Sequence, residues 1–581
     1  MKTLFLSLIL LASCSKKVDT SKKEIYLVSP ERIASLDPVQ ISDVYSGDEA
    51  GKVYEGLYEF HPLKRPYELV PNLAESMPVV SEDGLSYTVK LKKGVLFHDD
   101  ECFPNGKGRE VKIDDLIYSL KRLADPKNQA RGWWILDEKI VGLNEWRDKY
   151  AKADATNYDD AIAGLNKIDD YTIEFKFKRP YPQFLYGLAM PSTSIVAKEA
   201  VTKYGQEFLN HPVGTGAFTL KKLDQTNRIV YEKNPTFREK LYPSEGAPGD
   251  KEKGLLDDAG KRLPLVDKII VDVIVESQPV WLAFQKGKSD LVLLPKDNFD
   301  QALTKEREII PDLKTKGVKL VSDAMIDVGY YAFNHQNPLF KNKKLREAMN
   351  LAYDKEESNR IFYNNTAFPA QSVIPPGLGG YNPDFKNPKT AFNIEAAKKA
   401  LAEAGYPNGK GLPEITVETL NQTVARQMIE HFSKCMAKIG IKIKAGTNTW
   451  PELVRKVGKA QHQMYTMAWS ADYPDAENFL SLLYCPNKAP GSNGANYCNP
   501  EFDKLYKEAV VLQDGPERSA LYEKINKLVA DDLPWVFGFH RTRFYLTQGW
   551  LKNFKYMEFH HSQFQYLNVD LDAKKEFIKK F

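Results

Sequence analysis

Apolar and polar positions alternate along several short stretches of the N-terminal half, and others are rich in β-branched residues. Both patterns favour β-strands. The stretches concerned are 25–29, 88–97, 171–177, 229–233 and 268–275. Between them, 111–124 repeats Ile113, Leu116, Ile117, Leu120 and Leu123 at helical spacing. An apolar face of this kind predicts an amphipathic helix, so the fold class predicted is mixed α/β.

A second alternation of helix and strand patterns follows later in the chain. The predicted order is helix 393–406, strand 414–420, helix 424–440 and strand 441–447. Gly405 and Gly440 are expected to close the two helices, as glycine commonly does. This order predicts a second α/β lobe from about 326 to 534. The aromatic, strand-like segment 535–550 is expected to return to the first lobe.

The segment 237–264 lacks either periodicity. It is rich in proline, glycine and charged residues. Such composition predicts a surface insertion rather than a domain boundary.

Composition sets the size class and excludes some partners. The chain has 581 residues, of which 43% are hydrophobic, enough for two or three packed lobes. Lys and Arg number 81 against 77 Asp and Glu, and the two signs are interspersed. No nucleic acid is therefore expected as a partner, and no charged membrane surface either.

The N-terminus has the pattern of a secretory signal. Met1 and Lys2 precede an apolar run, 4–11, that is too short to span a bilayer, and Leu11-Ala12-Ser13-Cys14 follows. This run resembles a bacterial lipobox, in which Cys14 is lipidated; an ordinary cleaved signal is the alternative. We expect a signal peptide at 1–13, a lipidated tether at 14–23, and an extracytoplasmic, lipid-anchored protein on the periplasmic or cell-surface side.

Four further cysteines remain once Cys14 is set aside. Cys485 and Cys498 bracket a loop rich in Pro, Gly and Asn, which can bring its ends together, so we predict a disulfide between them. Cys102 and Cys435 are expected in different lobes as buried free thiols.

Enzyme signatures are mostly missing. There is no HExxH, GxSxG or GxGxxG motif, and GYPNGK at 405–410 is too short for a P-loop. His431 and Cys435 have a spacing that could ligate zinc, but two ligands without a third favour packing. His98 is expected in a turn. We predict no catalytic residue, no metal site and no cofactor.

Longer stretches carry a family resemblance. They are, in chain order, LAESMPVVSEDGLSYTVKLKKGVLFHDD, VKIDDLIYSLKRLADP, HPVGTGAFTL, YEKNP, AFNHQNPLFKNKKLREAMNLAYDKE and VIPPGLGGY. Together they resemble the bacterial extracellular solute-binding proteins of family 5, the oligopeptide- and dipeptide-binding subunits of ABC importers. The match runs from about Leu27 to Asp532. The segment ECFPNGKGRE departs from the family, which usually has a shorter linker there.

The resemblance implies a type II periplasmic-binding-protein fold, with two lobes hinged around an interlobe cleft and an extra subdomain on the first lobe. The expected divisions are lobe I at 24–57, 171–325 and 535–581, the extra subdomain at 58–170, and lobe II at 326–534. Repeated crossings between lobes are what builds a hinge.

The same resemblance assigns a ligand site to the stretch MAWSADYPDAENF. In the family an aspartate three residues after the tryptophan binds the α-ammonium group of a peptide, which implies that role for Asp472 after Trp469. The backbone of Ala468 to Ser470 is expected to pair with the ligand, and Tyr473 to cover its side chains. The alternative is a proline turn in which Asp472 bonds its own backbone. Asp475 is interpreted as a turn or cap residue.

The match also implies that the backbone near Ser42 and Val44 faces the ligand from the first lobe. Gly214 and Gly216 are interpreted as backbone turns without a ligand role. Dipeptide binders of the family carry an arginine near the position of Thr419 to Asn421, which is missing here. A dipeptide-only specificity is therefore disfavoured.

The sequence thus predicts a monomeric, non-enzymatic solute-binding lipoprotein that captures oligopeptides and docks to an ABC permease and its ATPase. Within the same fold, a nickel chelate, an opine, a sugar or a cell-wall peptide remains an alternative ligand. A surface receptor or chaperone without a permease, and an extracellular hydrolase, are the alternatives from other classes.

Overall fold

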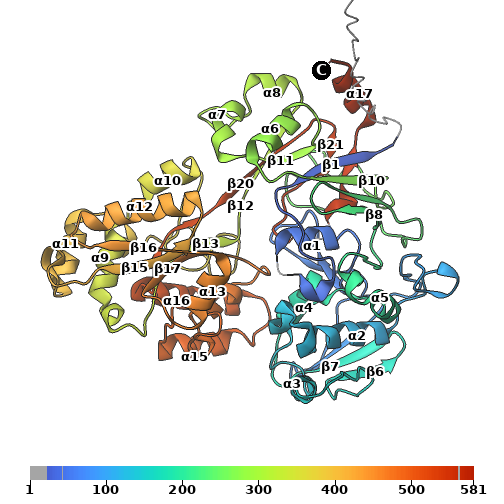
Figure 1. Ribbon diagram of the computed structural model, residues 1–581, viewed down its shortest axis with the longest axis horizontal. Coiled ribbons are helices and arrows are strands. Elements are labelled where there is room, and N and C mark those ends of the chain that lie inside the picture. The colour runs from blue at the N-terminus through green and yellow to red at the C-terminus, as the bar shows by residue number, and fades with distance from the viewer. Residues whose placement is uncertain (1–21, 42, 560–562, 581) are drawn as a thin grey trace, which may run out of the picture.

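The computed structural model describes residues 22–41, 43–559 and 563–580, so Cys14 and Ser42 lie outside the described residues. The chain forms two bodies of mixed helices and strands that are joined by a narrow connection (Figure 1). This architecture agrees with the mixed α/β prediction. We call the body that contains β1 lobe I and the other lobe II.

Lobe I is built on a sheet with the order β1-β10-β9-β8. Its strands are β1 (Glu24–Ser29), β10 (Lys268–Val273), β9 (Arg228–Lys233) and β8 (Phe218–Asp224). β1 runs parallel to β10, and the other pairs are antiparallel. Ile25, Ile229 and Ile269 are fully buried, which explains why these stretches carried a clear strand pattern.

A second sheet lies in the same body, with the order β4-β5-β7-β6. Its strands are β4 (Val79–Val80), β5 (Ser86–Lys90), β7 (Thr172–Lys176) and β6 (Leu165–Asp169), and helix α2 (Ile113–Ala124) contacts β6. The strand predicted over 88–97 ends at Lys90, since the chain turns at Gly94, where φ is 75°. β7 belongs to this sheet and lies beyond the subdomain boundary drawn at 170.

Lobe II contains a five-stranded sheet with the order β16-β15-β17-β13-β18. The strands are β16 (Ile443–Asn448), β15 (Ile415–Leu420), β17 (Met464–Ser470), β13 (Asp327–Phe333) and β18 (Trp535–Phe537). The helices of this lobe include α9 (Lys343–Ala352), α10 (Lys355–Tyr363), α11 (Ile394–Glu403), α12 (Thr423–Ala437), α13 (Trp450–Gly458), α14 (Glu477–Leu480), α15 (Pro500–Ala509) and α16 (Pro516–Asp532).

Two adjacent strands connect the lobes. β12 (Lys319–Ala324) and β20 (Thr542–Thr547) pair antiparallel in a small sheet that also contains β11 (Leu291–Leu293); β12 leads the chain into lobe II and β20 leads it back (Figure 1). Where they enter lobe II, the buried Asp327 carboxylate accepts hydrogen bonds from the backbone and side chain of Arg541. β18 pairs with β13, and Phe539 and His540 pair with Pro369 and Phe368 of lobe II.

The segment 237–264 forms no helix or named strand, but the prediction that it is a surface insertion is wrong for several of its residues. Tyr242, Asp250 and Leu263 are 2%, 1% and 1% exposed. Asp250 pairs with Lys555, 2.7 Å away, which holds the segment against the C-terminal part of the chain. Charged residues bury here as ion pairs, which hydrophobic periodicity does not reveal.

The disulfide between Cys485 and Cys498 is confirmed. Cys102 and Cys435 are free, as predicted, but Cys102 is partly exposed whereas Cys435 is buried. No helix in the described part of the chain combines the length and apolar character that a membrane crossing needs.

Candidate ligand-binding site

One edge of β17 is unpaired over its last residues. β17 pairs along its whole length with β13, but with β15 only at Met464 and Tyr465. The amide of Ala471 donates to the carbonyl of Ile326, and bonding alternates along an antiparallel pair. The backbone groups of Ala468 and Ser470 therefore point away from β13, toward the side that β15 leaves open. Both residues are exposed.

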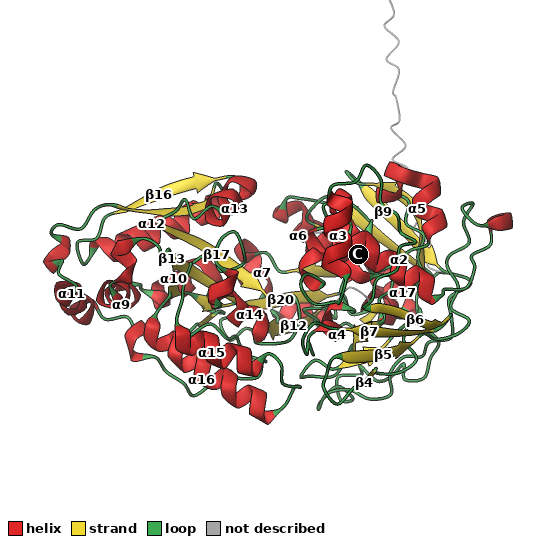
Figure 2. Cartoon of the chain, turned by 90° about the horizontal axis from the view of Figure 1, so that it is seen from below, coloured by secondary structure: helices red, strands yellow, loops and turns green. Residues whose placement is uncertain are grey.

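This open edge coincides with a change in the direction of chain winding. From β15 the chain passes through α12 to β16, the neighbour on one side of β15. From β16 it passes through α13 to β17, the neighbour on the other side of β15. A crevice forms at the carboxyl ends of neighbouring parallel strands where such connections diverge, and ligands bind there in open α/β sheets. In Figure 2, α13, β17 and α14 lie on the part of lobe II that faces lobe I.

Asp472 follows this strand end and is held by Asn478, a residue of α14. The Asn478 amide nitrogen donates to Asp472 Oδ2 at 2.9 Å, and its oxygen accepts from the Asp472 backbone at 3.1 Å and from Trp469 Nε1 at 2.9 Å. The carboxylate does not bond its own backbone, as a simple proline turn would have it.

Burial raises the pKa of Asp472 to about 6, the hydrogen bond from Asn478 opposes the rise, and the charge of Glu477 adds to it. Among the described residues, no cationic side chain lies within ion-pair distance of Asp472. The carboxylate is therefore kept partly from water without a positive partner of its own.

Asp475, three residues later, has a different environment. It is 4% exposed, its carboxylate lies 3.0 Å from Arg518, and it accepts a hydrogen bond from the Glu477 backbone at 2.9 Å. Burial raises its pKa to about 6, and Arg518 opposes the rise. These contacts make Asp475 a structural turn residue that is paired within the chain.

Tyr473 joins the two lobes. Its ring stacks on Tyr186 with centroids 5.7 Å apart and lies 6.2 Å from the ring of Trp134, and both partners come from lobe I. Its hydroxyl donates to Glu477, which also accepts from Tyr506. Tyr473 is 4% exposed, so lobe I covers the chain directly beside Asp472 in this conformation.

On the lobe I side, Val44 begins helix α1 (Val44–Ala50), which Asp43 caps by accepting from the Ser46 backbone. The Val44 side chain is 55% exposed, although it is apolar. No hydrogen bond in the described chain joins Val44 to residues 468–473. Ser42 is outside the described residues.

The glycines of Gly214-Thr215-Gly216 serve close packing. A Cβ atom at Gly214 or Gly216 would lie 2.2 or 2.6 Å from the carbonyl oxygen of Val53, so no larger residue fits. Neither glycine has a positive φ, so close packing rather than a left-handed backbone requires glycine at these two positions.

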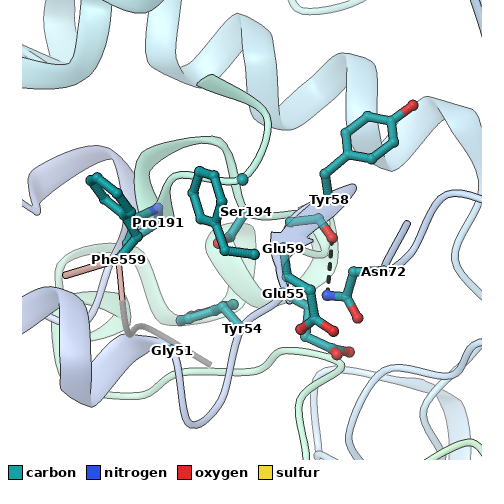
Figure 3. A pocket seen from close by; sticks show the side chains of 12 residues that line it. Gly51, Tyr54, Glu55, Tyr58, Glu59, Asn72, Pro191, Ser194 and Phe559 are labelled. Carbon is teal, nitrogen blue, oxygen red and sulfur yellow. Dashed lines mark hydrogen bonds between the residues drawn. The ribbon is translucent and has the colours of Figure 1, made fainter. Parts of the chain in front are cut away.

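Lobe I contains a small cavity of about 30 Å³. Figure 3 shows Phe559 and Pro191 at one end of it and Glu55, Glu59 and Asn72 at the other. Its carboxylates are compensated within the chain, since Glu55 pairs with Arg238 and Glu59 with Lys240.

Other candidate chemistry stays structural. His431 and Cys435 lie 3.6 Å apart on α12, but no set of three or more ligating side chains in the described part of the chain is arranged to hold a metal ion. His98 is buried, and its Nε2 lies 3.0 Å from the carbonyl oxygen of Gly216.

The structure thus brings Ala468, Trp469, Ser470, Asp472 and Tyr473 together at one strand end. The sequence analysis missed four residues that contact this group, namely Asn478, Glu477, Trp134 and Tyr186. Asn478 follows Asp472 closely in sequence, but its side-chain direction was not predictable from spacing. The two aromatic residues lie far away in sequence, and no pattern connects them to Tyr473.

Known proteins resemble this chain over most of its length. The family model described as bacterial extracellular solute-binding proteins, family 5 (middle), matches residues 68–491. Heme-binding protein A of Haemophilus influenzae is 29% identical over 529 residues, which cover 89% of this chain and 87% of that protein. The dipeptide-binding protein of Escherichia coli is 28% identical over 485 residues, 82% of each.

Solved structures share the two-lobed architecture. The periplasmic binding protein DppA of Helicobacter pylori in complex with the peptide STSA aligns with a TM-score of 0.72 and 25% identity, over 94% of this chain and 98% of that one. The oligopeptide-binding protein AppA of Bacillus subtilis in complex with a nonapeptide aligns with a TM-score of 0.67 and 23% identity, over 94% and 99%.

Proposed function

The chain belongs to family 5 of the bacterial extracellular solute-binding proteins, and on that premise we propose that it captures oligopeptides between its lobes and delivers them to the permease of an ABC importer. The observation that carries this proposal is the Asp472 carboxylate without a cation, placed at the end of an unpaired strand edge. An extended peptide supplies both missing partners, an ammonium group and a strand of backbone.

Each residue of the group has a proposed role. Asp472 accepts the α-ammonium group of the peptide, and the backbone of Ala468 and Ser470 pairs with its first residues. Backbone pairing does not depend on side chains, so such a site accepts many sequences. Trp469 and Tyr473 line the apolar surroundings, and Val44 and Ser42 approach from lobe I.

A peptide fits this site better than heme, which the name of one relative suggests. Heme offers carboxylates and no ammonium group. A carboxylate placed beside Asp472 would repel it. The proposed role is binding without chemistry, so neither a cofactor nor turnover is part of the proposal.

The proposed division of the chain follows the sheets. Lobe I comprises 24–57, 177–325 and the C-terminal part from 541, and lobe II comprises 326–540. The extra subdomain begins at 58 and extends to Lys176, because β7 completes its sheet. Ligand contacts to both lobes would favour the closed arrangement over the open one.

The proposed location is outside the cytoplasm, with Cys14 lipidated and residues 14–23 as a tether. The chain would act as a monomer beside its permease and ATPase. Globomycin, which blocks lipoprotein signal peptidase, tests the anchor: a lipidated precursor should accumulate, whereas a Cys14→Ser variant should stay unlipidated and its processing should not respond to globomycin.

Native mass spectrometry of the chain from residue 15 onward, followed by calorimetry, tests the ligand. We expect a ladder of co-purified short peptides, and binding of free-amine peptides that N-acetylation weakens by about 100-fold. Asp472→Asn should produce a similar loss, and the exposed Asp384→Asn should not. A single non-peptide species, or equal binding of acetylated peptides, would overturn the oligopeptide assignment.

A further inference from the structure

The Asn478 side chain makes its hydrogen bonds in the described structure with residues of the candidate site. It is 3% exposed, and one amide group reaches both Asp472 and Trp469. α14 carries it, and Asp475 fixes the start of this short helix by accepting from the Glu477 backbone. The Asn478 side chain is thus bonded both to the end of β17, at Trp469, and to the turn that follows it, at Asp472.

We propose that Asn478 is the positioning residue of the amine site: it aims the Asp472 carboxylate at the ligand and locks the Trp469 ring beside it. This inference rests on the proposed function, because it specifies how that site recognises an amine.

The direction of each hydrogen bond supports this role. The amide nitrogen of Asn478 donates to Oδ2, so the carboxylate cannot rotate freely, and Oδ1 stays available to an incoming donor. The amide oxygen accepts from Trp469 Nε1 and from the Asp472 backbone. A rotated amide would lose all three bonds, since it would face N–H groups with its nitrogen and the carboxylate with its oxygen.

Charge gives the arrangement a second consequence. Glu477 on α14 is the charged neighbour of Asp472, and it favours protonation of Asp472. Lys139 of lobe I interacts with Glu477, and burial lowers the pKa of Lys139 to about 8. The Asn478 donor therefore opposes the combined effect of burial and Glu477 on the pKa of Asp472, and it favours the ionised carboxylate that an amine requires.

Asn478→Asp is the informative variant because it keeps the size of the side chain while the donor to Asp472 is lost. Two carboxylates then share one site, so at least one must bind a proton. Asn526→Asp is the matched control: Asn526 is buried in the same lobe at 6% exposure, its side-chain oxygen accepts from the Ile374 backbone, and its backbone carbonyl accepts from the Ser372 hydroxyl.

Calorimetry from pH 5 to 8 on the whole mature chain tests the proposal with a free-amine peptide and its N-acetylated form. Asn478→Asp should weaken binding of the free-amine peptide at pH 7 by about 10- to 100-fold. It should also move the pH midpoint of binding upward by about one unit or more. The acetylated peptide should be little affected, and Asn526→Asp should match the parent protein.

Equal losses for both peptides, or an unchanged pH midpoint, would mean that Asn478 acts through the fold alone and would overturn the proposal. Ligand-free protein gives an independent readout. The pH dependence of urea unfolding, compared with and without Asp472→Asn, reports the ionisation of Asp472. If the protein binds no peptide, the proposed function fails; the positioning role then stands if Asn478→Asp shifts this ligand-free titration, and fails if it does not.

Discussion

Glu55 in lobe I and Asp472 in lobe II are both carboxylates removed from water, but their hydrogen-bonding and charged partners differ. Glu55 receives both Nη atoms of Arg238, at 2.5 and 2.8 Å, and the hydroxyl of Thr215 at 2.9 Å. These partners overcome burial and lower the pKa of Glu55. Asp472 receives an amide group and, from the described residues, no cation, and its pKa rises to about 6.

The contrast separates a structural charge from a functional one. A buried carboxylate that holds the fold together carries its own cation, since an unpaired charge is costly. A carboxylate left without a cation raises the energy of the empty site, and a ligand ammonium group can recover that energy on binding. The position of Asp472 at the strand end fits the second case, and the Glu55 group of lobe I fits the first.

Breaking the Glu55–Arg238 pair should have the largest effect. Glu55→Gln leaves the guanidinium of Arg238 without its bidentate partner, so we expect a loss of about 3–5 kcal/mol in the free energy of unfolding. Asp472→Asn should leave stability at pH 7 unchanged or higher. Urea unfolding of both variants measures the difference, and comparable losses would abolish the distinction.

Asp475, three residues after Asp472, offers a second test of the distinction between a paired and an unpaired carboxylate. Arg518→Gln removes the cation of the buried Asp475, and we expect a loss of about 2–3 kcal/mol at pH 8. The pKa of Asp475 is already raised to about 6. When an acid has a raised pKa in the folded state, the free energy of unfolding falls as pH rises from about 4 to 6. Without Arg518 this fall should be larger. The deficit should therefore be smaller at pH 4; a deficit independent of pH would contradict this account.

The sequence predicted the parts of this comparison that local pattern records. The main strands of lobe I and the helix–strand alternation of lobe II have clear periodicity, and the structure contains them at nearly those residues. The disulfide was predictable because loop composition and spacing suffice. Residues 469–472 resemble a family motif, and this resemblance pointed to Asp472.

The Glu55 group was not predictable, for a physical reason. Arg238 lies in a stretch whose polarity indicated a surface insertion, but its charge is buried by pairing with a residue far away in sequence. The contacts of Tyr473 with Trp134 and Tyr186 also arise only when the lobes approach. Neither kind of contact produces a periodic pattern of hydrophobic residues in the sequence.

The affinity for peptides should depend on pH through the ionisation of Asp472. This effect should be smaller than that of breaking the buried ion pairs. The ammonium ligand requires the ionised carboxylate, and the pKa of Asp472 in the empty site is about 6. Affinity for a free-amine peptide should fall about tenfold from pH 7 to pH 5. Calorimetry at both values checks this, and N-acetylated peptides provide the control because they should show no such dependence. A flat profile for both ligands would mean that Asp472 is no acceptor.

Trp134 should give the smallest effect and should act on binding alone. Its ring is 38% exposed and meets Tyr473 across the lobes, so it contributes where the closed arrangement covers the Asp472 group. An aromatic pair is worth about 0.5–1.5 kcal/mol beyond its buried area, which predicts that Trp134→Ala weakens peptide binding about 2- to 10-fold. Unfolding of the empty protein should change little, in contrast to Glu55→Gln. Small-angle scattering with saturating peptide should show a less closed ensemble in Trp134→Ala than in the parent protein. Weaker binding with full closure would mean that Trp134 contacts the ligand itself, whereas unchanged affinity would show that the Tyr473 stack does not stabilise closure.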